Sequence, residues 1–240
     1  MRNIEVCLSP KLLDLFNLEN KIAVVVDVLR ASTIITTMLK NGAEKIIPVE
    51  SLEIAKEYKA KGFLVAAERK GKKVDFADFD NSPYSFTPEI VKGKSIVYST
   101  LNGTNTINLV KDARQVLIAS FLNLNVVVDL LSSFENDIII VCSGWQGNYC
   151  SEDVLLAGAI SEKLIQTKKF RTTCDASNSA IDLWGIAKGN LFEYIKKTFQ
   201  YKRLTSLGLG HVIEYCFTIG TTGIIPFLKD GYIIDFKKIL

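Results

Sequence analysis

The chain has 240 residues, of which 48% are hydrophobic and 23% are charged, a composition typical of a globular protein with a sizeable core. Its 29 basic and 26 acidic residues give a net charge of +3, which is too small to indicate a nucleic-acid-binding or membrane-binding surface. We expect no transmembrane helix because no apolar run reaches about 18 residues, and no signal peptide because the first residues lack an apolar core.

The cysteine and histidine content limits the metal and redox chemistry open to the chain. Its five cysteines lack C-x-x-C spacing, so we expect reduced thiols and a cytoplasmic protein, not disulfides or a zinc site. His211 is the only histidine. This excludes a metal centre built from several histidines. A Ser-His-Asp triad would have to use His211, which has no recognisable motif around it.

Short apolar runs alternate with amphipathic stretches along most of the chain. Runs rich in β-branched residues predict strands, and stretches that begin at small or capping residues predict helices. A strand at 22–27 precedes a helix at 32–43, and a strand at 45–49 precedes a helix at 51–62. Further strands are expected at 63–68, 95–99, 115–120 and 137–144, and further helices at 103–113 and 151–167.

The last third of the chain follows a different pattern. Residues 174–217 indicate helices, and Asp230-Gly231 between two apolar runs predicts a tight hairpin. The whole pattern predicts an α/β fold, with a largely parallel or mixed sheet, flanking helices, a C-terminal helical segment and a hairpin. We expect a single α/β domain over residues 1–240; two subdomains with a weakly marked boundary near 130–136 are the alternative.

Several predicted strands end on polar residues. These ends are Asp27, Glu68, Ser99-Thr100, Ser120 and Cys142-Ser143. The carboxyl ends of parallel strands lie along one edge of a sheet, where ligands of open α/β folds bind. We therefore expect side chains that are far apart in sequence to converge there.

Two of these strand ends carry a carboxylate with an arginine nearby. In "VVVDVLRAST", Asp27 and Arg30 are either reagents or only a strand end and a helix start. In "AAERKGK", Glu68 is a candidate Mg²⁺ ligand beside Arg69, because Mg²⁺ prefers one or two carboxylates together with water and phosphate oxygens. The alternative for this second pair is a solvated loop.

Three further loops contain residues suited to binding an anion or a metal. "DFDNSP" presents Asp78, Asn81 and Ser82, or is an ordinary turn. "STLNGTNT" opens a helix whose first N–H groups favour an anion, although it lacks the Gly-Lys pair of a P-loop. The alternative is N-capping by Asn102 or Thr104.

The richest loop is "CSGWQGNYCSED". Gly144 and Gly147 allow the backbone to approach a ligand closely. Glu152 and Asp153 begin a helix, where acids either serve a site or only complement the helix dipole.

Together these five motifs resemble the 2-phosphosulfolactate phosphatase family over about residues 20–230. The family consists of Mg²⁺-dependent phosphoric monoester hydrolases of coenzyme M biosynthesis. The resemblance implies hydrolysis of the phosphate ester of a small sulfonated hydroxy acid by an α/β protein. It also implies functional residues. The catalytic positions are Asp27, Arg30, Glu68, Arg69 and Asp153; the substrate-binding positions are Asn81, Ser82, Asn102, Gly103, Thr104, Gly144 and Gly147; the Mg²⁺ ligands are drawn from Asp27, Glu68, Asp78, Glu152 and Asp153.

The chain departs from the family's pattern at four places. Ala67 and Asp80 stand where glycines are usual, Leu101 replaces a threonine, and Gln200-Tyr201 stands where a His-Gly pair is expected. These departures leave open whether the substrate is 2-phosphosulfolactate or a close relative.

Two other classes of function remain as alternatives. A phosphatase of haloacid dehalogenase type would use Asp27 as the nucleophile, but it expects a second acid two residues later, where this chain has Leu29. A non-catalytic anion-binding protein would keep the arginines and glycine turns without needing so many acids. We expect no nucleic-acid or membrane partner, and a homodimer is left open.

Overall fold

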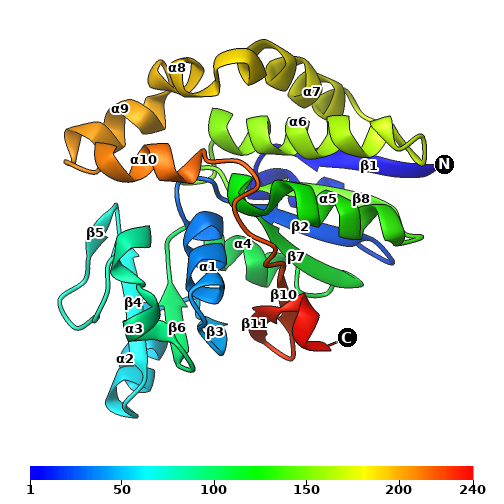
Figure 1. Ribbon diagram of the computed structural model, residues 1–240. Helices are drawn as coiled ribbons and strands as arrows, with labels where there is room; N and C mark the ends of the chain where they lie inside the picture. Colours follow the sequence, from blue (N-terminus) through cyan, green and yellow to red (C-terminus); the bar gives the residue numbers. More distant parts are fainter. Residues whose placement is uncertain (240) are drawn as a thin grey trace.

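The structure is a computed structural model that describes residues 1–239. One mixed eleven-stranded sheet has the order β5-β4-β6-β3-β11-β10-β7-β2-β8-β1-β9, with helices packed around it (Figure 1). The strands are β1 (Arg2–Cys7), β2 (Ile22–Val26), β3 (Lys45–Pro48), β4 (Leu64–Arg69), β5 (Lys72–Lys73), β6 (Ser95–Ser99), β7 (Gln115–Ala119), β8 (Ile138–Cys142), β9 (Phe170–Thr172), β10 (Pro226–Lys229) and β11 (Tyr232–Asp235). The predicted α/β class with a mixed sheet is confirmed.

Helices connect most of the strands and form the C-terminal segment. They are α1 (Ala31–Lys40), α2 (Leu52–Ala60), α3 (Pro88–Val91), α4 (Gly103–Leu109), α5 (Leu124–Ser133), α6 (Ser151–Gln166), α7 (Asp175–Ala187), α8 (Leu191–Lys196), α9 (Phe199–Ser206) and α10 (Gly210–Cys216). Short 3-10 helices are η1 (Pro10–Leu15), η2 (Pro83–Ser85), η3 (Phe121–Asn123), η4 (Lys188–Asn190) and η5 (Phe236–Ile239). None of the helices within residues 1–239 is both long enough and apolar enough to span a bilayer.

The sheet consists of two parallel halves joined by the C-terminal hairpin. In one half, β7, β2, β8, β1 and β9 pair in parallel, and in the other β4, β6 and β3 do so. Strands β10 and β11 lie between the halves and pair antiparallel with β7 and β3. The turn between them has positive φ at both Asp230 and Gly231, as a tight two-residue hairpin requires, so that prediction is confirmed.

Strand β2 lies at the centre of the larger half and is buried on both faces. All five of its residues are inaccessible, which explains the unbroken apolar run in the sequence. Val24 and Val26 belong to the core under α5 and α6, whereas Ala23 and Val25 belong to the core under α1. The chain leaves this buried strand directly into the loop that carries Asp27.

Helices α7 to α9 form an arc that starts beside α6 and ends near the β4–β5 turn, and α10 returns from there toward α1 (Figure 1). The arc is anchored at Gly158 of α6, because a Cβ atom there would overlap the Ala180 carbonyl oxygen of α7 and lie 2.9 Å from Trp184 Cβ. Close packing at this point fixes the origin of the arc, and the arc in turn brings α9 over the carboxyl ends of the strands.

Substitution of Gly158 by alanine tests this anchor. We expect Gly158→Ala to lower the free energy of unfolding by about 1–3 kcal/mol, because the added methyl group forces α6 and α7 apart. Gly185→Ala in α7 is the matched control, since a Cβ there meets nothing within 4 Å and alanine favours a helix by up to about 1 kcal/mol. Urea denaturation of both variants measures the difference, and equal stabilities would contradict close packing at Gly158.

Candidate active site

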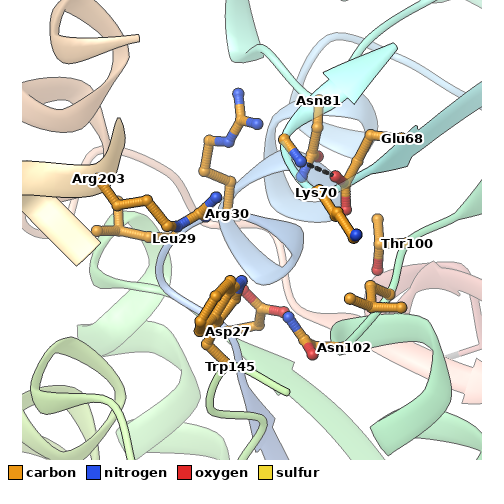
Figure 2. Close-up of a pocket in the computed structure, with 12 residues that line it drawn as sticks. Asp27, Leu29, Arg30, Glu68, Lys70, Asn81, Thr100, Asn102, Trp145 and Arg203 are labelled. Carbon is orange, nitrogen blue, oxygen red and sulfur yellow. Dashed lines mark hydrogen bonds between the residues drawn. The ribbon is translucent and has the colours of Figure 1, made fainter. Parts of the chain in front are cut away.

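A polar pocket lies at the carboxyl edge of the parallel strands (Figure 2). The end of β4, the loops after β2, β4, β5, β6 and β8, and one side chain of α9 line it. The lining residues are Asp27, Leu29, Arg30, Glu68, Lys70, Gly71, Asn81, Thr100, Leu101, Asn102, Trp145 and Arg203. The structure therefore brings the predicted strand ends at Asp27, Glu68 and Thr100 together.

Asp27 is held rigidly at the end of β2. Its Oδ1 atom accepts a hydrogen bond from the Ala31 N–H at 3.1 Å, and Ser32 bonds to both the N–H and the carbonyl oxygen of Asp27. A Cβ at Gly103 would lie 2.8 Å from Asp27 Oδ2, so only glycine lets α4 begin this close to the carboxylate. Burial raises the pKa of Asp27 to about 6; the Ala31 N–H lowers this pKa, and the negative charge of Glu68 raises it further.

Arg30 begins α1 and is almost completely buried. Its side chain is only 4% exposed, and its Nη1 atom has no hydrogen-bond partner among the described residues. A buried guanidinium nitrogen without an acceptor is unfavourable. Since Arg30 also lines the pocket, an anionic ligand is the partner that would satisfy it.

Glu68 and the β4–β5 turn form the opposite wall. Glu68 Oε2 accepts the Gly71 N–H at 2.6 Å, which fixes the turn, and Lys70 at its tip has a φ of 56° and lines the pocket. Figure 2 shows Lys70 beside Glu68, facing the same space as Asp27. Arg69 turns away instead: its guanidinium donates to the Glu68 carbonyl oxygen at 2.7 Å and to Ser99 Oγ at 3.1 Å.

The "DFDNSP" loop contributes one side chain to the pocket. Asn81 lines it, with Oδ1 accepting a hydrogen bond from the buried Tyr98 hydroxyl, which orients the amide. Asp78 lies outside, where its carboxylate accepts from Lys59 Nζ at 2.5 Å and from the Val65 N–H at 2.8 Å. Ser82 also lies outside the pocket lining, and its N–H donates to Asp80 Oδ1 at 3.0 Å.

The start of α4 is fixed by its own threonines. The Thr104 hydroxyl donates to the Thr100 carbonyl oxygen at 2.9 Å, and the Thr104 N–H donates to Thr100 Oγ1 at 3.2 Å. Thr104 is completely buried, so it supports the loop. Asn102 lines the pocket, and its Oδ1 accepts the Gln146 N–H at 3.1 Å.

Asp153 joins the loops that follow β2 and β8. Its Oδ1 accepts the Val28 N–H at 2.8 Å and its Oδ2 accepts the Gly144 N–H at 2.9 Å. Burial raises the pKa of Asp153, and the charges of Asp27 and Glu152 raise it further, while the two N–H donors lower it. Both oxygens are therefore engaged behind the pocket, not in it.

The glycines of the β8–α6 loop are required by its turn. Gly144 has a φ of 60°, and a Cβ there would overlap the Asn148 carbonyl oxygen; Gly147 has a φ of 75° and packs against Lys11. This turn places Trp145 against the pocket. Glu152 is buried nearby, its Oε2 has no partner among the described residues, and burial raises its pKa to about 7.

Three charged or aromatic residues of the pocket lining were not predicted from the sequence: Lys70, Trp145 and Arg203. No strand pattern marks the first, because Lys70 follows the last residue of β4 and lies in a turn, where its φ is 56°. Trp145 lies within a motif that was noticed for its glycines. Arg203 belongs to a helical segment in which no motif marks it.

Among the described residues, the charged side chains of the pocket form no salt bridge with one another. Two carboxylates, Asp27 and Glu68, and three cations, Arg30, Lys70 and Arg203, line the same small space. The ion pairs found within residues 1–239 join other side chains: Lys21–Glu5, Lys59–Asp78, Lys188–Glu162 and Lys196–Glu193. Unpaired charges of both signs at one place indicate a site completed by a ligand.

The donors available to a metal are Asp27 and Glu68. No three histidine, cysteine, aspartate or glutamate side chains of the described residues converge on one point. Two carboxylates nevertheless match Mg²⁺, which takes its other ligands from water and phosphate oxygens. Of the other predicted ligands, Asp78, Glu152 and Asp153 do not line this pocket, and the assignment of the metal stays a prediction.

Comparison with known proteins decides the family. The family model described as 2-phosphosulpholactate phosphatase matches residues 7–231. The chain belongs to the 2-phosphosulfolactate phosphatase family. A protein of Clostridium perfringens strain SM101 named "Probable 2-phosphosulfolactate phosphatase" is 40% identical, with 96% of this chain and 95% of that protein covered.

Two further proteins with the same printed name support this membership. The protein of Caldanaerobacter subterraneus is 38% identical, with 90% of this chain and 91% of its own length covered. That of Thermotoga maritima is 39% identical, with 90% and 92% covered. The resemblance inferred from the five motifs is thus confirmed, while the roles of individual residues stay predictions.

Substitution of Asp153 tests its place between the two loops. We expect Asp153→Asn to lower the free energy of unfolding by about 1–3 kcal/mol, because an amide N–H₂ group would face a buried N–H donor. Asp129→Asn on α5 is the control, since that exposed side chain forms no hydrogen bond in the described residues. Urea denaturation at neutral pH gives both values, and an unaffected Asp153→Asn protein would show that the two bonds contribute nothing.

Proposed function

We propose that the chain is a Mg²⁺-dependent phosphatase that hydrolyses 2-phosphosulfolactate to sulfolactate and phosphate. The observation that carries this proposal is the pocket with two carboxylates and three unpaired cations. The substrate has the matching character, because a phosphate, a carboxylate and a sulfonate are three anionic groups on a three-carbon skeleton. The names of the family and of its relatives support the same substrate.

Asp27 and Glu68 are the residues that would hold the cation. When bound, Mg²⁺ would polarise a phosphoryl oxygen and offset the negative charge of the phosphate. Arg30, with a free Nη1 and the planar fork of a guanidinium, would donate to phosphoryl oxygens. In the overall reaction a water oxygen attacks phosphorus, the phosphorus–oxygen ester bond breaks, and the released oxygen takes up a proton to give the hydroxyl of sulfolactate.

Removal of the metal is the first test. Excess EDTA is expected to abolish phosphate release from 2-phosphosulfolactate, and excess Mg²⁺ to restore it, because Asp27 and Glu68 repel the phosphate unless a cation lies between them. Phosphate release is measured colorimetrically. Full activity in EDTA would contradict the metal, whereas lack of activity under all conditions would favour the non-catalytic anion-binding alternative.

Substitution of Arg30 by lysine tests the contact with the phosphate. We expect kcat/KM to fall roughly 10- to 150-fold, equivalent to about 1.5–3 kcal/mol, because lysine keeps the charge but loses the fork. Arg171→Lys, at the exposed position of strand β9, is the control and should stay within about twofold of the wild type. Wild-type kcat/KM in Arg30→Lys would rule out a forked contact.

Isotope labelling separates attack by water from attack by Asp27. Single-turnover hydrolysis in ¹⁸O-water is expected to place the label in phosphate and none in the protein. The haloacid dehalogenase alternative predicts label in the peptide that contains Asp27, because water would then hydrolyse an aspartyl phosphate. The apolar Leu29 in the pocket lining, where that alternative expects a second acid, supports attack by water.

A further inference from the structure

Arg203 reaches the pocket from α9, a part of the chain remote from the strand-end loops. Its Nε atom donates to Gln200 Oε1 at 2.7 Å, and its guanidinium carbon lies 5.0 Å from the centre of the Trp145 ring. Its Nη1 atom lies 3.5 Å from the position of a Cβ at Gly71, so the end of the fork lies near the β4–β5 turn. The orientation of the guanidinium is therefore fixed, and its terminal nitrogens remain available to a ligand.

Gln200 fixes this arrangement from behind. The side chain is only 3% exposed, and its Nε2 atom lies 3.7 Å from Cys150 Sγ, to which it donates. Cys150 belongs to the loop that also carries Trp145. Gln200 thus links α9 to the loop that carries Trp145. Because the Arg203 guanidinium bonds to Gln200 and covers the Trp145 ring, both contacts of Arg203 depend on Gln200.

The three cations of the pocket are suited to different anionic groups of a ligand. Arg30 lies next to Asp27, where the phosphate would meet the metal, and Lys70 is a flexible point charge at a turn tip. Arg203 is a fixed planar fork on an indole face. A guanidinium is weakly hydrated and donates two parallel hydrogen bonds, which matches the oxygens of a sulfonate, itself a weakly hydrated anion.

We propose that Arg203 binds the sulfonate of the substrate and sets the preference for sulfonated over unsubstituted phosphorylated hydroxy acids, with Gln200 as its positioning residue. This inference rests on the proposed function, because it concerns the non-reacting end of the same substrate. It assigns the reacting phosphate to Arg30 and to the cation that Asp27 and Glu68 would hold, and the sulfonate to Arg203.

Binding of the product tests the inference without requiring turnover. Isothermal titration with sulfolactate and with lactate, both in Mg²⁺, compares a ligand that has the sulfonate with one that lacks it. We expect the wild type to bind sulfolactate at least about tenfold more tightly than lactate, and Arg203→Gln to lose this difference by weakening sulfolactate alone. Lys202→Ala, which removes an exposed positive charge from the next position of α9, should keep the difference.

Two results of this titration would overturn the inference. One is a wild type that binds the two ligands equally, and the other is an Arg203→Gln protein that weakens both ligands equally or neither. Thermal unfolding of each variant verifies that it is folded, and Arg203→Lys provides a second substitution that keeps the charge but removes the fork.

Kinetics with a matched pair of substrates test Gln200. The ratio of kcat/KM for 2-phosphosulfolactate to that for 2-phospholactate should fall in Gln200→Leu, which removes the acceptor for Arg203 Nε, and recover in Gln200→Glu, which restores it. An unchanged ratio in Gln200→Leu would refute the positioning role. A wild type that turns over neither substrate would refute the proposed function, while the titration would still decide whether Arg203 recognises the sulfonate.

Discussion

The Asp153 carboxylate holds two strand-end loops together, and the positions of the other pocket residues follow from it. Its bond to the Val28 N–H sets the loop that carries Asp27 and Arg30, and its bond to the Gly144 N–H sets the loop that carries Trp145. From that second loop, the Gln146 N–H reaches Asn102 at the start of α4, and Trp145 supports Arg203 of α9. One buried acid thereby connects elements from most of the chain.

The pocket keeps opposite charges in one place without letting them pair. Burying these charges is unfavourable: burial raises the pKa of Asp27, and the nearby charge of Glu68 raises it further. A buried guanidinium nitrogen without an acceptor adds to the cost. A protein that needed only stability would pair these charges or replace them with apolar side chains. Their arrangement is understandable if a cation binds between the acids and an anion with several charged groups binds among the bases.

The sequence allowed the α/β class and the convergence of Asp27, Glu68 and Thr100 to be predicted, because both follow from local patterns and from the geometry of parallel strands. It did not reveal that the C-terminal hairpin joins two halves of one sheet, since that depends on pairing across most of the chain. Arg203 was missed for a related reason: helical periodicity identifies α9 but does not tell which neighbour it faces. Arg69 was predicted and Lys70 was not, because a motif marks positions, whereas the direction of a side chain depends on where the strand ends.

Coupled binding of a cation and an anion tests the account most directly. Isothermal titration of Mg²⁺ into the protein, with and without saturating inorganic phosphate, measures whether the two occupy one site. The account predicts that phosphate tightens Mg²⁺ binding by about tenfold or more and that Mg²⁺ tightens phosphate binding by the same factor. Mg²⁺ binding that is unaffected by phosphate, or undetectable in its presence, would contradict a pocket whose unpaired acids and bases serve a metal and a phosphate together.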